Sequence, residues 1–113
     1  MTKNAPGYSK LLQNSKVIGV WDDHDYGTND GGRHFKFRER NRDLWLDFIG
    51  EPSDTERRLQ KGTPIHQDYF VTKGDVTVHV ILLDNRYDSD ADSIFGTGDY
   101  LGEEQWLWLD KAL

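Results

Sequence analysis

The sequence contains no cysteine, which excludes disulfide bonds, thiolate zinc sites and a cysteine nucleophile. It has no apolar run of membrane-spanning length and no N-terminal apolar region of the kind found in signal peptides. Basic residues are also fewer than acidic ones, 14 against 20, which leaves a net charge of -6. Because this charge repels a phosphate backbone unless basic groups are segregated, we expect no nucleic-acid-binding surface. The cellular compartment stays open.

The length of 113 residues allows one domain. A domain of this size buries roughly two-thirds of the surface that its unfolded chain exposes. Aromatic residues make up 12% of the chain and supply material for a core, while 30% charged residues and 11 glycines indicate much loop and solvated surface. We expect residues 1–15 to be an extended lead-in or a weak helical turn, and residues 16–113 to form the domain.

Three segments have the residues of β-strands. Residues 16–21 form a short apolar, β-branched run, which predicts a buried strand. Residues 67–72 and 75–84 predict two strands joined by Lys73-Gly74 in a hairpin turn. The second of them is so apolar towards its end that we expect a central strand buried on both faces.

Three other segments predict helices. Apolar residues at helical spacing predict a helix over 37–49, and a Ser-Asp-Thr-Glu capping box predicts a short helix over 53–61. A third helix is expected over 102–113, with Trp106 and Leu109 on its apolar face. The predicted order is strand, loop, helices, hairpin, loop and helix, which indicates a mixed α/β (α+β) fold with a sheet flanked by helices.

The first polar cluster follows the predicted strand 16–21 directly. It consists of the four residues Asp22, Asp23, His24 and Asp25, called the DDHD segment below, and is followed by Asn29 and Asp30. Carboxylates this close repel one another unless a cation neutralises them, and the imidazole can act as a general acid near neutral pH. The alternative interpretation is a solvated acidic turn, since such turns are common.

The second polar cluster, Asp84-Asn85-Arg86, stands at the exit of the last predicted strand. A guanidinium can bind a phosphate through two parallel N–H bonds, which makes Arg86 a candidate substrate ligand. The alternative is a surface arginine paired with Asp84 or Asp88. Both polar clusters follow strand ends, where ligands bind in open α/β sheets.

A third acidic segment has a degenerate EF-hand spacing. Asp88, Asp90, Asp92 and Asp99 fall at positions 1, 3, 5 and 12 of such a loop, but Ser93 stands where the motif needs glycine. We interpret this segment as a solvated acidic loop. A second candidate function for the chain is nevertheless a non-catalytic module that binds divalent cations through its two Asp-rich loops.

Four blocks of the sequence resemble the PhoD-like (alkaline phosphatase D) phosphatases, a family of the calcineurin-like phosphoesterases. The likeness covers most of the chain from Val17 onward, in the family's order. The blocks are Val20–Gly27 (VWDDHDYG) with Asn29-Asp30 and Gly32, Leu46–Pro52 (LDFIGEP), Val80–Tyr87 (VILLDNRY) and Leu101–Trp106 (LGEEQW). The resemblance implies a partial αββα sandwich around a dinuclear metal centre. It also implies iron with calcium as the metals, with manganese or zinc as alternatives.

The resemblance further implies roles for individual residues. Asp22 and Asp23 would be metal ligands, with Asp23 at the position of a metal-binding asparagine. His24 would donate a proton or hydrogen bond to the leaving oxygen, and Asp22 or Asp25 would orient its imidazole. The side chains expected to bind the substrate are those of Arg86, Asn29 and Asp30. The expected substrate is a phosphate mono- or diester, attacked by a hydroxide that the metals activate.

The family's remaining metal-binding blocks are not found in this sequence. No Gly-Asp pair precedes Trp21, and the pairs Gly74-Asp75 and Gly98-Asp99 stand in turn contexts. Two or three ligands from one loop cannot hold a dinuclear centre tightly. We therefore expect the chain to be the central segment of such a domain, weak or inactive alone, with the remainder of the catalytic domain as its partner.

Overall fold

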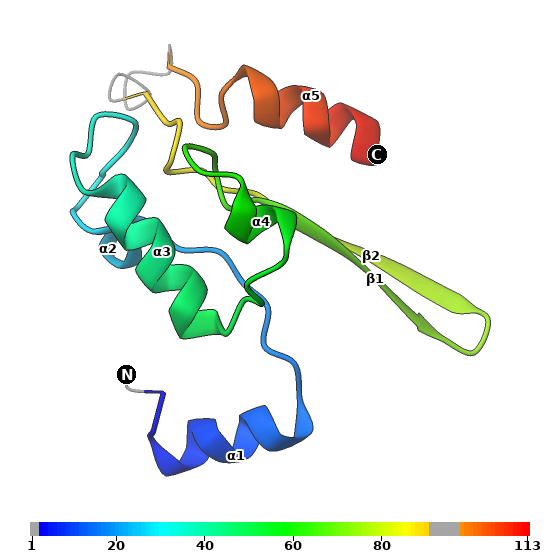
Figure 1. Cartoon of the computed structure of the whole chain (residues 1–113). Helices are drawn as coiled ribbons and strands as arrows, with labels where there is room; N and C mark the ends of the chain where they lie inside the picture. The colour runs from blue at the N-terminus through cyan, green and yellow to red at the C-terminus, as the bar shows by residue number, and fades with distance from the viewer. Residues whose placement is uncertain (1–2, 91–97) are drawn as a thin grey trace.

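A computed structural model describes residues 3–90 and 98–113 of the chain. Helices are combined with one antiparallel sheet of two strands, so the expected mixed α/β class is found (Figure 1). The elements in order are α1 (Pro6–Asn14), α2 (Asp23–Tyr26), α3 (Arg38–Ile49), α4 (Glu56–Leu59), β1 (Gln67–Lys73), β2 (Val76–Leu82) and α5 (Glu103–Ala112). None of these helices is long and apolar enough to cross a membrane.

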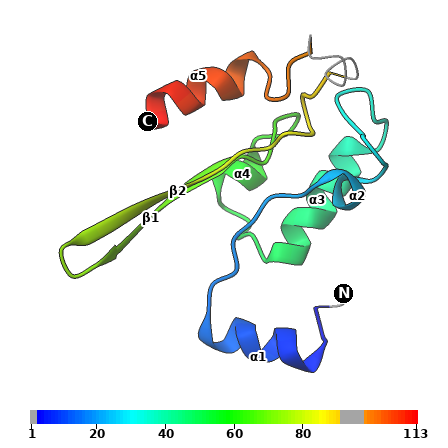
Figure 2. The same ribbon diagram turned by 180° about the vertical axis from the view of Figure 1, so that it is seen from behind.

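The elements spread out from a small centre. Helices α3 and α4 and the loops around them form this centre, while α1 and the hairpin tip both lie far from it in the two opposite views (Figures 1 and 2). The principal extents are 42 × 36 × 26 Å, and the Cα radius of gyration is 15.4 Å. A 100-residue domain is expected near 13 Å, so the chain is more extended than a typical domain of its size.

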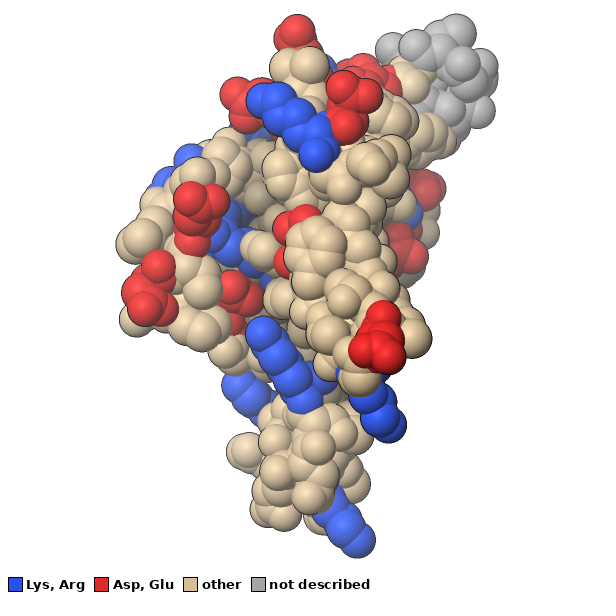
Figure 3. All heavy atoms as spheres, turned by 90° about the vertical axis from the view of Figure 1, so that its right-hand side faces the viewer, with Lys and Arg blue, Asp and Glu red and all other residues tan. Residues whose placement is uncertain are grey.

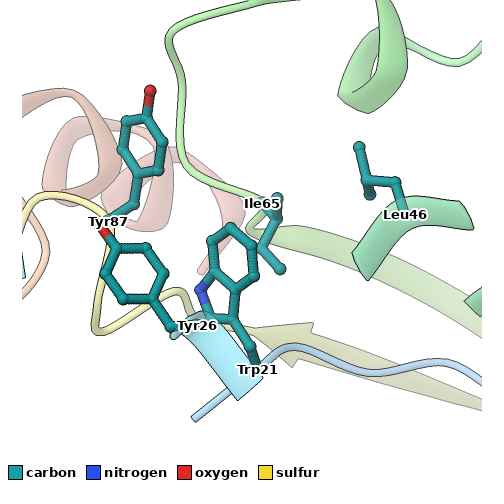
Figure 4. Close-up of a cluster of buried hydrophobic side chains, with 5 residues drawn as sticks. All are labelled: Trp21, Tyr26, Leu46, Ile65 and Tyr87. Carbon is teal, nitrogen blue, oxygen red and sulfur yellow. The ribbon is translucent and has the colours of Figure 1, made fainter. Parts of the chain in front are cut away.

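The buried core consists of five side chains contributed by loops and by the helices α2 and α3. They are Trp21, Tyr26, Leu46, Ile65 and Tyr87, each at most 2% exposed (Figure 4). The rings of Trp21 and Tyr26 meet edge to face, with 5.0 Å between centroids. This aromatic contact packs the end of α2, which carries the DDHD segment, against the core.

Two buried arginines hold the segment between α3 and β1 in place. From α3, Arg42 donates through Nε to the carbonyl of Thr63 at 2.7 Å and through Nη2 to the carbonyl of Arg57. The Arg57 side chain in turn donates to the carbonyls of Ile65 at 2.8 Å and Gly19 at 2.9 Å. A guanidinium offers five N–H donors, so each arginine satisfies carbonyls that no regular structure pairs.

The predicted hairpin is confirmed, with its turn one residue later than expected. Strands β1 and β2 pair antiparallel from Gln67↔Leu82 to Lys73↔Val76, which leaves Gly74 and Asp75 as a two-residue turn. Gly74 has φ 59°, a conformation that glycine adopts without steric cost. A positive φ at the first turn position matches the twist of hairpin strands.

The expectation that the second strand is buried on both faces is wrong. In β2, Val76 is 64% and Val78 is 53% exposed, and the described residues form no third strand beside it. Only the half from His79 to Leu82 is partly buried. The apolar run indicates residues that favour a packed sheet. Within the described residues, however, no layer covers the hairpin tip around Val76 and Val78.

The prediction of a strand over 16–21 is also wrong, although its burial is confirmed at Trp21 (2% exposed). A strand needs a hydrogen-bonded neighbour, and the described residues provide none beside this segment. The carbonyl of Gly19 accepts from the Arg57 guanidinium instead. The predicted burial therefore holds at Trp21, whereas residues 17–20 are only partly buried and Lys16 is exposed.

The helix predictions hold for position and fail in some details. Helix α3 ends at Gly50, which has φ 75°, as its glycine stop signal predicted. Helix α4 forms, but its N-cap is Thr55, without a side-chain capping bond, so the capping-box interpretation is wrong. In the lead-in, the nine-residue helix α1 is longer than a single turn and buries no residue.

Helix α5 forms where it was predicted, but its expected apolar face is only partly covered. On this face, Trp106 is 51% exposed and Leu113 is 90% exposed. The buried residue of this helix is Gln105, a polar side chain next to the expected apolar face rather than on it. The reason is a set of hydrogen bonds that Gln105 makes to the site described below.

Charged side chains of both signs are interspersed with uncharged ones over the face in Figure 3. Several form surface ion pairs, among them Lys61 with Asp43 at 2.6 Å and Arg58 with Asp47 at 2.9 Å. Exposed pairs of this kind contribute about 0–1 kcal/mol each. The fold therefore depends on the core and the buried polar contacts.

Candidate functional site

The DDHD segment forms the short helix α2 and its N-cap. Asp22 is the N-cap, and its backbone N–H donates to Oδ2 of Asp25 at 3.3 Å. His24 is exposed. Among the hydrogen bonds of the described residues, none joins its imidazole to Asp22 or Asp25. The expected orienting role of these carboxylates therefore stays a prediction.

Asp23 organises the glycine-containing loop that follows α2. Its Oδ1 accepts from the backbone N–H of His24 at 2.8 Å, and its Oδ2 accepts from the backbone N–H of Asp30 at 3.0 Å. The hydrogen bond from Asp30 lowers the pKa of the Asp23 carboxyl. Asn29 donates to the Asp30 carboxylate at 2.6 Å. The loop thus folds back so that both expected substrate ligands, Asn29 and Asp30, stand beside α2.

The two polar clusters of the sequence meet at one surface. Arg86 donates through Nε at 3.0 Å and through Nη2 at 2.6 Å to the same oxygen, Oδ1, of Asp22, across 64 positions of sequence. The Asp22 side chain is 71% exposed, whereas that of Arg86 is 18% exposed. The Arg86 guanidinium holds the pKa of the Asp22 carboxyl below its usual value. Arg86 thus pairs with Asp22, and not with Asp84 or Asp88 as the alternative interpretation had it.

Beneath this pair lies the fully buried carboxylate of Asp84. Its Oδ1 accepts from the Trp21 indole at 2.8 Å and from the backbone N–H groups of Arg86 and Tyr87, both at 3.0 Å. Its Oδ2 accepts from the backbone N–H of Ile65 at 2.9 Å. A carboxylate is an acceptor only, and every one of these contacts presents a donor. Asp84 therefore joins three separate parts of the chain.

Gln105 attaches helix α5 to the same point. Its Oε1 accepts from the backbone N–H of Asp84 at 2.8 Å, and its Nε2 donates to the carbonyl of Asp84 at 2.8 Å and of Leu101 at 3.1 Å. All three bonds are buried. Because a buried amide needs such partners, they explain why glutamine is the buried residue of α5.

The donor groups of the DDHD segment fit part of a metal site. Carboxylates and an imidazole suit iron, manganese, zinc or calcium, and each carboxylate keeps free lone pairs beyond the hydrogen bonds named above. Within residues 3–90 and 98–113, however, no three Asp, Glu or His side chains converge as a ligand set. Asp22 and Asp23 can therefore contribute oxygens to a cation but do not enclose one with the residues described.

The EF-hand-like segment, Asp88 to Asp99, is described only at its ends, since residues 91–97 lie outside the described part of the chain. The Asp90 carboxylate pairs with Arg33 at 3.0 Å. The Asp99 carboxylate accepts an indole N–H at 2.8 Å and two backbone N–H groups at 3.0 and 3.1 Å around the start of α5. The indole hydrogen bond is the main cause that lowers the pKa of Asp99. Both carboxylates are thus already hydrogen-bonded within the protein.

A shallow hollow of about 390 Å³ lies next to the DDHD segment. Asp25 lines it together with Asn41, Leu44, Trp45 and Phe48 of α3. Its wall is largely apolar, with one carboxylate at its edge. It gives room for an apolar group beside the exposed face of α2.

Sequence reasoning identified the exposed residues of this region and missed its buried anchor. Asp84 was considered only as a partner of Arg86, because a carboxylate directly after an apolar strand usually indicates a solvated turn. The resemblance to PhoD-like phosphatases rests on the motifs of the sequence itself. No family model matches this chain, and neither curated proteins nor solved structures include a match to it.

Proposed function

We propose that this chain is part of a metal-dependent phosphoric ester hydrolase of the alkaline phosphatase D or phosphodiesterase type. The observation that carries the proposal is the contact between Asp22 and Arg86 at 2.6 Å. It brings the DDHD segment and the Asp-Asn-Arg cluster, the two motifs of the PhoD-like resemblance with the most chemistry, to one surface. A guanidinium can bind the anionic ester, and neighbouring carboxylates can bind the cation.

In this proposal Arg86 binds the phosphate. Its Nε and Nη2 already converge on a single carboxylate oxygen at 3.0 and 2.6 Å, and a phosphate oxygen offers the same acceptor geometry. Binding of the ester would replace Asp22 as the partner of Arg86. The Asp22 carboxylate would then be released towards a cation, so both groups change partner in one step.

His24 is the proposed donor to the leaving oxygen. Its side chain is exposed on α2, and an imidazole can give a proton near neutral pH. Asp25 supports the helix turn that carries it, through the hydrogen bond to the N–H of Asp22. Asn29 and Asp30, folded back beside α2, are proposed to contact the substrate.

Asp22 and Asp23 are the proposed metal ligands, with iron and calcium as the expected ions and manganese or zinc as alternatives. When bound, the metals supply an activated water and neutralise charge that develops on the phosphate. Since two carboxylates are too few for this task, the chain is proposed to need further ligands from the remainder of a catalytic domain. Alone it should be weak or inactive.

The finer fold proposed is a partial calcineurin-like αββα sandwich, in which the hairpin belongs to a larger sheet. Two-stranded ribbons are at best marginally stable alone. The exposed apolar residues Phe70, Val71, Val76 and Val78 of the hairpin support its place in a covered sheet.

Hydrolysis of p-nitrophenyl phosphate and of its bis ester, with iron, calcium, manganese or zinc added in turn, tests the proposal. The variants are His24→Ala and Asp23→Ala, and the matched control is Asp110→Ala, an exposed carboxylate on α5. We expect weak metal-dependent turnover that both site variants lower and the control leaves unchanged. Turnover that neither site variant lowers would contradict the assignment. If turnover is absent, a titration with Mn²⁺ followed by NMR of the backbone N–H groups decides whether the DDHD segment holds a cation.

A further inference from the structure

We propose that Asp84 is a positioning residue of the candidate site, and that its buried carboxylate sets Arg86 against Asp22. The identity of the substrate, a phosphate ester, rests on the proposed function. The positioning of Arg86 by Asp84 does not, and it can be tested without substrate or metal.

One oxygen atom links the two halves of the site. Asp84 Oδ1 accepts from the Trp21 indole at 2.8 Å and from the backbone N–H of Arg86 at 3.0 Å. Trp21 directly precedes Asp22. The shared oxygen therefore lies a short covalent path away from both partners of the surface pair, and it fixes the points from which their side chains leave the backbone.

The anchor itself cannot move easily. Asp84 is fully buried, and its second oxygen is held by the backbone N–H of Ile65 at 2.9 Å. Gln105 binds both the N–H and the carbonyl of the same residue. A rotation of the carboxylate would break bonds on both sides at once, and buried donors without acceptors are costly.

The surface pair alone does not account for the position of Arg86. Asp22 is 71% exposed, and ion pairs with such exposure are held weakly because solvent screens them and long side chains lose entropy. The Arg86 side chain is nevertheless mostly covered. The anchoring of its backbone N–H by Asp84 supplies the constraint that the pair lacks.

If Asp84 only stabilises the fold, the result should differ. Loss of any other buried hydrogen bond around Asp84 should then make the Arg86 side chain equally mobile. Gln105→Ala is the matched control, because Gln105 is also fully buried and holds the backbone of Asp84 but does not touch the carboxylate. It should destabilise the fold and leave the donors to Oδ1 in place.

The test is the hydrogen exchange rate of the Arg86 Nε–H, measured by NMR on the full chain under conditions where each variant is folded. In Asp84→Asn an amide N–H₂ replaces one acceptor, and we expect at least roughly tenfold faster exchange, the loss of one charged hydrogen bond. Gln105→Ala should leave the rate unchanged. An unchanged rate in folded Asp84→Asn, or an equal rise in both variants, overturns the proposal.

Trp21→Phe is the second variant in case Asp84→Asn does not fold. It removes the indole donor and keeps the carboxylate, and we expect faster exchange at Arg86 Nε–H because Asp22 loses its anchor. An unchanged rate would overturn the positioning role. In the unmodified chain, the Arg86 Nε–H could exchange slowly at a rate that neither inorganic phosphate nor added metal changes. That result would refute the proposed function and leave the positioning role intact.

Discussion

Replacement of Arg42 by methionine tests whether buried hydrogen bonds hold the centre of the fold. Arg42 is fully buried in α3, and burial lowers the pKa of its guanidinium. Methionine keeps the apolar stem and the helix propensity but removes the donors. The segment that these donors hold leads to Ile65, whose N–H meets the anchor Asp84. The substitution therefore probes the support of the site as well as the stability of the domain.

The expected cost follows from the acceptors that lose their donor. These are the carbonyls of Arg57, Gln60 and Thr63, of which the contact to Arg57 is buried and the other two are part-buried. An orphaned buried acceptor costs about 1–3 kcal/mol, and water can reach the part-buried ones. Removal of a desolvated charge, whose Nη1 has no hydrogen-bond partner, offsets part of this cost. The net loss expected is about 2–4 kcal/mol.

Urea unfolding followed by tryptophan fluorescence measures this loss. Arg40→Met is the matched control, since Arg40 lies two positions earlier on the same helix and is exposed. Its substitution removes the same charge and should change the free energy of unfolding by less than about 0.5 kcal/mol. If Arg42→Met and Arg40→Met are equally stable, the carbonyl contacts of Arg42 do not hold the fold.

Three further predictions concern single positions. Gly27→Ala should cost roughly 2–4 kcal/mol in urea unfolding, because φ is 146° and a Cβ would lie 2.5 Å from an aromatic ring; Gly7→Ala, with open space around it, should cost little. Burial lowers the pKa of His66 below 6.5, so the unfolded chain binds the proton more readily. Stability should then fall as the pH drops below about 6.5, and His66→Gln should flatten that profile. Arg86→Gln should raise the pKa of Asp22 towards 3.8 in a ¹³C NMR titration, since Arg86 is the main cause of its depression.

Each of these has a clear contrary result. Equal stability of Gly27→Ala and Gly7→Ala would show that the backbone at Gly27 relaxes without strain. An unchanged pH profile in His66→Gln would place the acid-sensitive group elsewhere. An unchanged titration of Asp22 in Arg86→Gln would mean that the pair in the structure does not persist in solution.

The elements with strong local signals could be predicted from the sequence. The hairpin had a glycine at its turn, and α3 had both an apolar period and a glycine stop at Gly50. These signals act over a few residues, so a sequence displays them directly. Their errors were small, such as the shift of the turn to Gly74-Asp75.

The elements that depend on distant partners could not be predicted. Residues 16–21 can form a strand only beside a neighbouring strand. Their apolar composition indicates burial and not such pairing. The burial of Gln105 and Arg42 depends on carbonyls and amides far along the chain. Such partners leave no periodic signal in a sequence.

For the site, the sequence indicated the exposed groups and not their arrangement. Both polar clusters were expected to follow strand ends; the strand before the DDHD segment does not form, yet Asp22 and Arg86 do meet. The buried link through Asp84 was missed because a carboxylate after a strand usually indicates a solvated turn. Only the convergence of donors from Trp21 and Ile65 distinguishes it.

A titration with Mn²⁺, followed by paramagnetic broadening of backbone N–H signals, tests most directly whether the DDHD segment holds a cation. We predict broadening centred on residues 22–30, which Asp23→Ala abolishes and Asp110→Ala leaves unchanged. Broadening centred on residues 88–99, with none at residues 22–30, would place the cation at the other Asp-rich segment. That result, or the absence of any broadening at residues 22–30, would contradict the proposed metal site.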